Sequence, residues 1–161
     1  MIEGFLFVLT LATAIACGLV AGFFFAFSAC MMKALARLPA SRGVAAMQSI
    51  NVVVINPWVM GALFGTALAC AVLVVAALIE WGEAYAVFLL VGGLLYLVGV
   101  IVLTIVYHVP RNNALMTLDP DDPDAASHWN RYVRTWTAGN HVRTVAPLAT
   151  AVLLTIAMRV S

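Results

Sequence analysis

Three long runs without a charged residue constrain this chain more than any other feature. Residues 4–32, 43–79 and 84–110 contain no Asp, Glu, Lys or Arg. Only 9% of the 161 residues are charged, whereas a soluble domain carries about 25%. A transmembrane helix needs about 20 consecutive, mainly apolar residues. The sequence therefore predicts an all-α integral membrane protein, with residues 1–161 forming a single domain.

A fourth apolar run is shorter than a membrane is thick. The run from Val145 to Met158 covers about 21 Å at 1.5 Å per residue, against a hydrocarbon core of about 30 Å. Asn140, His141 and Arg143 are therefore drawn toward the bilayer, and polar groups at that depth usually line a site. We expect a left-handed four-helix bundle with spans at about 4–27, 53–79, 85–107 and 142–160.

Basic residues predict the orientation of the bundle. They cluster after the first span and between the third and fourth spans, whereas the second connection carries Glu80 and Glu83 without Lys or Arg. The positive-inside rule places loops one and three in the cytoplasm and both termini outside, as in a bacterial inner membrane. Arg159 at the outer end is an exception. The basic residues of these two loops are Lys33, Arg37, Arg42, Arg111, Arg131 and Arg134. With a net charge of +1 and no polybasic tract, no nucleic-acid partner is indicated.

Residues 109–141 form the one long connection, a cytoplasmic loop and helix. Pro110 is expected to end span three, and a solvated acidic turn at 119–124 to cap a short amphipathic helix before span four. One helical stripe in this region includes Trp129, Tyr132, Val133, Trp136, Asn140, Arg143 and Thr144. The stripe is either an aromatic belt at the membrane surface or the wall of a pocket, and both can hold. A kink at Gly139 would turn His141 inward.

Further polar residues gather at the same predicted edge of the membrane. Single Asn and Gln residues in membrane helices often only link helices, but so many at one end favour a site. Asn56 precedes Pro57, which we expect inside span two. Cys17, Cys30 and Cys70 are expected to be free thiols packed as small apolar residues. The polar residues at this edge are Ser28, Gln48, Asn51, Asn56, His108, Asn112 and Asn113.

These residues also carry a family resemblance over nearly the whole chain. The chain resembles the anthrone oxygenases, small four-helix membrane proteins. Relatives commonly carry proline where Lys33 stands and an aromatic residue where Gly139 stands. The matching pieces are Phe27-Ser28, Ile50-Asn51 with Asn56-Pro57, Val109-Pro110-x-Asn112-Asn113-x-Leu115, and Trp136 with Asn140-His141-Val142-Arg143-Thr144.

The resemblance implies a cofactor-independent monooxygenase that oxidises an anthrone-like polyketide to a quinone with molecular oxygen. No flavin, haem or metal is expected, and the sequence has no Gly-rich dinucleotide loop. Such a site needs a base near neutral pKa, for which His141 is the first candidate and His108 the second. Donors for the developing oxyanion are expected from Asn140, Arg143, Asn112 and Asn113. Trp136 is expected to stack on the substrate, with further contacts from Ser28, Asn51 and Asn56.

Two alternatives remain open. His108 and His141 can share a metal or haem in a membrane oxidoreductase. The chain can also be a non-enzymatic protein that binds a lipid or quinone. The expected partners are an apolar aromatic small molecule and membrane lipid, and no pattern indicates an oligomeric state.

Overall fold

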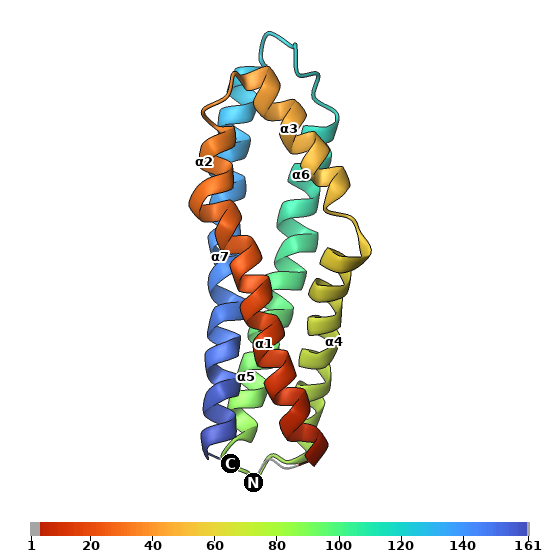
Figure 1. The fold of residues 1–161 in the computed structure, drawn as a ribbon, viewed down its shortest axis with the longest axis vertical. Coiled ribbons are helices and arrows are strands. Elements are labelled where there is room, and N and C mark those ends of the chain that lie inside the picture. Colours follow the sequence, from red (N-terminus) through yellow and green to blue (C-terminus); the bar gives the residue numbers. More distant parts are fainter. Residues whose placement is uncertain (1–3, 161) are drawn as a thin grey trace.

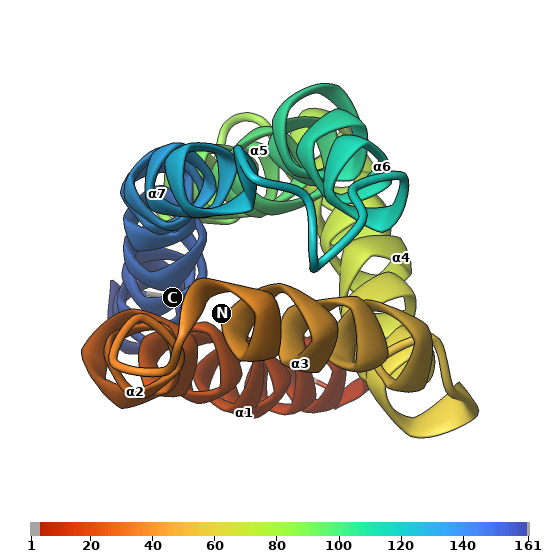
Figure 2. The same cartoon turned by 90° about the horizontal axis from the view of Figure 1, so that it is seen from above.

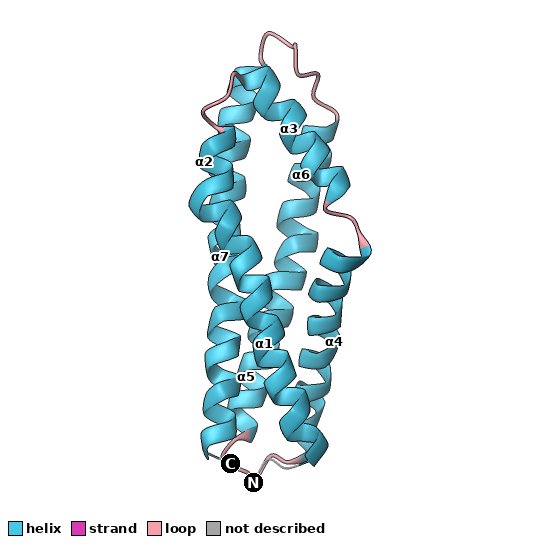
Figure 3. Cartoon of the chain, viewed as in Figure 1, coloured by secondary structure: helices cyan, strands magenta, loops and turns pink. Residues whose placement is uncertain are grey.

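The computed structural model describes residues 4–160, and the elements in this range are helices (Figure 3). Four long helical stretches run side by side, and both ends of the described chain lie at the same end of the bundle (Figure 1). The first stretch is α1 (Gly4–Ala26), η1 (Phe27–Met31) and α2 (Met32–Leu35), the second is α4 (Pro57–Ile79), the third is α5 (Ala86–Tyr96), η2 (Leu97–Val102), η3 (Thr104–His108) and α6 (Val109–Met116), and the fourth is α7 (Ala125–Val160).

The predicted all-α fold with four membrane helices is confirmed. Each of the four stretches is long and apolar enough to cross a bilayer. Each stretch contacts two neighbours, so the bundle is square in cross-section (Figure 2). Three stretches extend past their predicted spans, because a helix can continue into water once its side chains find other partners.

Two predictions about prolines are wrong. Pro57 does not interrupt a span but begins α4, where the Asn56 side chain accepts hydrogen bonds from the backbone N–H groups of Trp58 and Val59. Pro110 does not end the third stretch, which continues to Met116. The π-helical turn of η3 lies just before it, where the Val109 N–H bonds to Thr104 rather than to the fourth residue back. This wider turn accommodates the proline ring, which would clash in a regular α-helix.

The expected short amphipathic helix is not a separate element. It is the first half of α7, which continues without interruption for 36 residues. At 1.5 Å per residue α7 is about 54 Å long, far more than the hydrocarbon thickness of about 30 Å. α7 is therefore longer than one membrane span requires. The half of the bundle opposite the termini, which holds η1, α2, η3, α6 and the first half of α7, is called the head below.

The head is closed by α3 (Ala40–Val53), which runs across the bundle from α2 toward α4 (Figure 2). It packs on α7 and α6. The Gln48 amide donates to the backbone oxygens of Leu115 and Leu118 at distances of 2.9 and 2.8 Å. Gln48 thus links α3 to the end of α6, as expected of a polar residue that joins helices.

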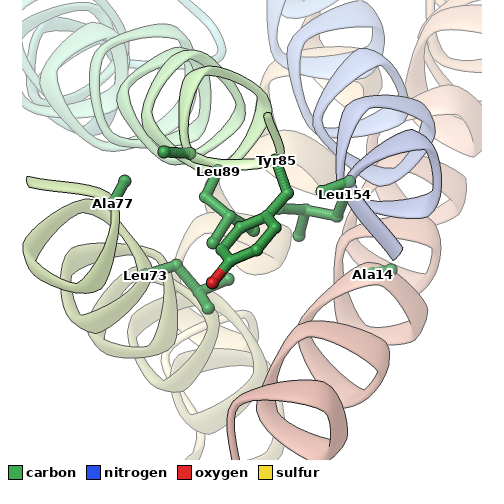
Figure 4. Packing of buried hydrophobic residues seen from close by; sticks show 8 residues of the cluster. Ala14, Leu73, Ala77, Tyr85, Leu89 and Leu154 are labelled. Carbon is green, nitrogen blue, oxygen red and sulfur yellow. The ribbon is translucent and has the colours of Figure 1, made fainter. Parts of the chain in front are cut away.

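At the opposite end the four stretches pack around Tyr85 (Figure 4). Its ring lies among Leu73, Leu89 and Leu154, and its hydroxyl donates to the carboxylate of Glu80 in the turn between α4 and α5. This hydrogen bond raises the pKa of Tyr85 from 10 to about 12. The contact holds the α4–α5 turn against the bundle.

The middle of the bundle is apolar and tightly packed. The Tyr96 hydroxyl donates to the Leu63 backbone oxygen, so this buried polar group is satisfied. All three cysteines are free, as predicted. Cys17 and Cys70 are packed in the interior, whereas Cys30 is exposed, so the prediction of packing is wrong for Cys30.

Candidate functional site

The predicted polar and aromatic stripe of α7 faces the inside of the bundle. Trp129 and Trp136 are only 2% and 4% exposed. Tyr132, Asn140 and Arg143 are also buried, whereas Val133 and Thr144 are half-buried. The stripe therefore lies in the interior of the bundle, and its role as the wall of a pocket stays a prediction. The belt interpretation is wrong for these two tryptophans, because they pack against α1, η1 and α3 instead of lipid headgroups.

Asn140 joins α7 to the first stretch. Its Nδ2 donates to the Phe24 backbone oxygen and to Ser28 Oγ, both at 2.8 Å. Its Oδ1 accepts from Arg143 Nη2 at 2.8 Å. The amide is therefore fully engaged, and it fixes the Arg143 guanidinium in place. Arg143 Nη1 also donates to Thr104 Oγ1 at 3.4 Å.

Arg143 is a buried cation enclosed by aromatic rings. Its Cζ lies 4.4 Å from the ring centroid of Phe24 and 5.0 Å from that of Trp136. Such cation–π contacts stabilise a guanidinium away from water. Arg143 Nε is buried without a hydrogen-bond partner. It is therefore a donor available to an oxygen atom of a bound molecule.

His108 is the buried histidine of this region. Its side chain is 0% exposed, and neither Nδ1 nor Nε2 has a hydrogen-bond partner. Its ring meets Trp136 and Tyr107 edge-on, with centroid distances of 5.3 and 5.2 Å. Buried polar atoms are seldom left unpaired in proteins, so His108 is the most unusual residue of the head. A bound molecule reaches it only after a neighbouring ring moves.

Asn112 orients two of the aromatic rings around this histidine. Its Oδ1 accepts hydrogen bonds from Trp136 Nε1 and from the Tyr132 hydroxyl, each at 2.9 Å. The rings of Tyr132 and Trp136 stack with centroids 6.4 Å apart. Asn112 was predicted to contact substrate, and in this structure it holds the wall of the site.

Irregular helical turns position three of these polar groups. Ser28 lies in η1, and Thr104 and His108 lie in η3, which are π-helical segments. A π-helical turn changes the direction of the side chains that follow it, and such turns are frequent at functional sites. Sequence periodicity did not reveal these turns. Pro110, shortly after η3, was the one signal of irregular geometry there.

His108, Asn112, Trp136, Asn140 and Arg143 form one cluster, and Asn51 lies on α3 at its edge. It is buried, and its amide lies beside the phenol of Tyr132. Its Nδ2 nevertheless has no hydrogen-bond partner, and the same is true of Trp129 Nε1. The head thus carries several buried donors without a hydrogen-bond partner.

Three of the predicted site residues lie elsewhere. His141 is exposed on the outside of α7, and Asn113 is exposed on α6. Asn56 caps α4. α7 runs through Gly139 without interruption, and His141 is exposed, so His141 is not turned inward as expected.

Gly139 has a different role from the one predicted. A Cβ at this position would lie 2.5 Å from Tyr107 Cε1 and 3.0 Å from His108 Nε2. The glycine therefore allows close approach of α7 to η3. Because residues turn by about 100° along a helix, His141 lies about 200° around α7 from the side that faces His108. In this structure the two histidine side chains therefore lie on different sides of α7 and do not converge on one point.

The arrangement has the chemical capacity for proton transfer and for binding an anion. His108 carries a nitrogen that can accept a proton, and Arg143 carries a fixed positive charge and a free donor. Both lie against the ring of Trp136. Among the described residues there is no group of three or more His, Cys, Asp or Glu side chains that could hold a metal ion.

A groove lies on the outer side of this cluster, between α6 and α7. Its volume is about 490 Å³. The lining residues are Arg111, Ala114, Leu115, Thr117, Leu118, His128, Arg131, Tyr132 and Thr135. Tyr132 is shared by the groove and the cluster, so the two are adjacent.

Comparison with known proteins identifies one family. The family model described as "Anthrone oxygenase" matches residues 58–153. This range includes the residues of η3, α6 and α7 that form the cluster, but not Ser28 or Asn51. No curated protein and no solved structure matches the chain.

Proposed function

The chain belongs to the anthrone oxygenase family, and on this premise we propose that it is a membrane oxygenase acting on an anthrone-like aromatic molecule. The product is the corresponding quinone, and molecular oxygen is the oxidant. The proposal rests on one observation: His108 is fully buried, and neither of its ring nitrogens has a hydrogen-bond partner. It lies beside a buried arginine and among aromatic rings, where a flat apolar substrate would be bound.

The proposed reaction balances without a further reductant. An anthrone has a CH₂ group between two aromatic rings, opposite a ketone. Loss of one proton gives an electron-rich enolate that donates electrons to O₂, and a carbon–oxygen bond forms to give a peroxide. Cleavage of the oxygen–oxygen bond with loss of the second C–H proton gives the new C=O group. One oxygen atom of O₂ enters the quinone, and the other leaves as water.

His108 is the base in this proposal. A neutral imidazole nitrogen can accept a proton from an acidic C–H bond. A nitrogen without a hydrogen-bond partner is free to approach the substrate C–H bond. His141, the first candidate from sequence, has an exposed side chain on the outside of α7, so the geometry favours His108.

Arg143 stabilises the enolate oxygen. Its charge lies in a region shielded from water, where electrostatic stabilisation is strongest. Asn140 acts through Arg143 by accepting from its Nη2, so Asn140 is a positioning residue. Trp136, oriented by Asn112, supplies a flat surface for the aromatic substrate. No flavin, haem or metal has a role in this scheme.

Oxygen uptake tests the proposal directly. The purified protein is treated with a chelator and given anthrone in detergent, and the rate is compared with that of buffer and empty micelles. Uptake above both blanks, with anthraquinone formed, is the expected result. Uptake that requires added copper or iron would reject the cofactor-free scheme. Tight retention of anthrone without turnover would instead identify a binding protein.

A further inference from the structure

The groove between α6 and α7 has the composition of a binding site for an anionic aromatic molecule. Its lining includes Arg111, Arg131 and His128 and no acidic residue. Leu115 and Tyr132, which also line it, are almost fully buried and form its inner, apolar part. Small-molecule sites typically have volumes of about 300–1,000 Å³, so a groove of about 490 Å³ is large enough for a fused aromatic ring system.

Arg111 is held in place by the protein. Its Cζ lies 3.4 Å from the ring centroid of Tyr107, and its Nη1 donates to the Tyr107 backbone oxygen at 2.8 Å. The Tyr107 hydroxyl donates in turn to the Thr135 backbone oxygen on the opposite wall. An arginine has five N–H donors, so these contacts leave others for an anion. A preorganised guanidinium binds a carboxylate in a two-pronged geometry.

The groove leads toward His108. The Tyr132 ring stacks on Trp136, and Trp136 meets His108 with a centroid distance of 5.3 Å. Tyr132 itself is held by its hydrogen bond to Asn112. A molecule in the groove is thus separated from His108 by the rings of Tyr132 and Trp136.

We propose that this groove is the access site for substrate and that it selects aromatic molecules bearing a carboxylate. Arg111 and Arg131 bind the carboxylate at the mouth, and the rings of the substrate lie against Leu115 and Tyr132. Displacement of Tyr132 then opens the path to His108. This inference rests on the proposed function and adds to it the acidic group of the substrate.

The test is a binding experiment with the full chain in nanodiscs of zwitterionic lipid. The probe is anthracene-2-carboxylate, and the matched neutral probe is 2-(hydroxymethyl)anthracene. The variants are Arg131→Gln and, as a control, Arg134→Gln, an exposed arginine on the same helix that does not line this groove. Fluorescence titration should show that Arg131→Gln weakens binding of the carboxylate about tenfold. Neither variant should change binding of the neutral probe by more than about twofold.

Three results would overturn the inference. Equal losses of affinity for the carboxylate in Arg131→Gln and Arg134→Gln would indicate only a general effect of surface charge. Equal losses of affinity for the charged and neutral probes in Arg131→Gln would show that the carboxylate is not recognised. If phosphatidylglycerol in the nanodisc removes the effect of Arg131→Gln, the groove binds lipid headgroups instead.

Failure here is distinguishable from failure of the proposed function. Anthracene has no oxidisable CH₂ group between its rings, so binding is scored without turnover. If the protein binds the carboxylate as expected but consumes no oxygen, the proposal for the groove is supported and the proposed oxygenase activity is rejected. If the protein shows anthrone-dependent oxygen uptake but binds the charged and neutral probes alike, the oxygenase activity is supported and the proposal for the groove is rejected.

Discussion

His108 and His141 have the same side chain in opposite surroundings. His108 is buried among aromatic rings with both nitrogens unpartnered, whereas His141 is exposed on the outside of α7. We expect His108→Gln to lower kcat for anthrone oxidation by about 100-fold or more, because a positioned general base contributes about 10²–10⁴ to the rate. His141→Gln should retain activity within about twofold. Oxygen uptake as a function of anthrone concentration measures both variants.

The melting temperature of each variant is the control for this comparison. Replacing a buried ring also changes packing, so His108→Gln is informative if it still melts cooperatively. An equal loss of kcat in a stably folded His141→Gln would contradict the assignment of the base.

The Asn140 side chain hydrogen-bonds α7 to the first helical stretch. Its side chain makes two donor bonds and accepts one from Arg143. Asn140→Ala should lower the free energy of unfolding by about 2 kcal/mol, since interhelical hydrogen bonds in membranes contribute about 0.6 kcal/mol each and a buried guanidinium also loses a partner. Ser28→Ala, which removes one acceptor from the same network, should cost about 0.6 kcal/mol. Unfolding in mixed micelles measures both, and equal costs would contradict the role of Asn140.

Helical periodicity in the sequence predicted which residues of α7 are buried, but it did not predict which histidine is buried with them. The burial of Trp136, Asn140 and Arg143 follows directly from their common helical face. His141 lay off this face and was drawn into the site only by an expected kink at Gly139. In the structure that glycine allows close packing instead. A glycine in the sequence is compatible with either a kink or close packing, so the residue alone does not distinguish them.

At the level of elements, the contact between α7 and η3 depends on Gly139. A Cβ there would come within 2.5 Å of Tyr107 Cε1. Gly139→Ala should therefore push the two elements apart and destabilise the protein by about 1–3 kcal/mol, with a loss of oxygenase activity through displacement of His108. The control is Gly61→Ala in α4, where an added Cβ meets nothing within 4 Å. Thermal unfolding and oxygen uptake are measured on both variants.

This prediction has a clear contrary result. Gly139→Ala with the stability and activity of Gly61→Ala would mean that α7 and η3 are not in close contact. The π-helical turns that create this contact were not predictable from apolar spacing, because π-helical and α-helical turns differ by one residue in their hydrogen bonds. Hydrophobic periodicity is evaluated over windows of about 11–18 residues, so a difference of one residue in a single turn is not detected.

For the whole molecule, two exposed tryptophans indicate how the bundle lies in the membrane. Trp58 and Trp81 are 88% and 61% exposed and flank α4 at its two ends. Exposed Trp at both ends of a membrane helix is typical of the two headgroup layers. From Arg143 to the end of α7 is about 26 Å, close to the hydrocarbon thickness. The polar cluster therefore lies near one end of a segment of α7 that is long enough to cross the hydrocarbon core.

The orientation proposed from the basic residues makes a testable prediction. Alkaline phosphatase fused after Ser161 should be active, because it is active only outside the cytoplasm, and a fusion after Leu118 should be inactive. Green fluorescent protein at the same two positions should give the opposite pattern. A reversed pattern in both reporters would place the head and its groove outside the cell and contradict the positive-inside assignment.

The fold was predictable because charge-free runs determine membrane spans almost without reference to other residues. Helix ends outside the expected spans were not predictable, since water can satisfy the backbone hydrogen-bonding groups of a helix end or of a loop. For that reason α3, the extension to Met116 and the continuous α7 became clear only from the structure. The site occupies this less predictable region, the head.

Isotope labelling tests the central claim most directly. The chelator-treated protein is given anthrone under ¹⁸O₂, and the quinone is analysed by mass spectrometry at short times, beside a protein-free blank. We expect one ¹⁸O atom in each anthraquinone, formed faster than in the blank and slowed about 100-fold in His108→Gln. Quinone without ¹⁸O, or formation at the rate of the blank, would contradict the account of this chain as an oxygenase.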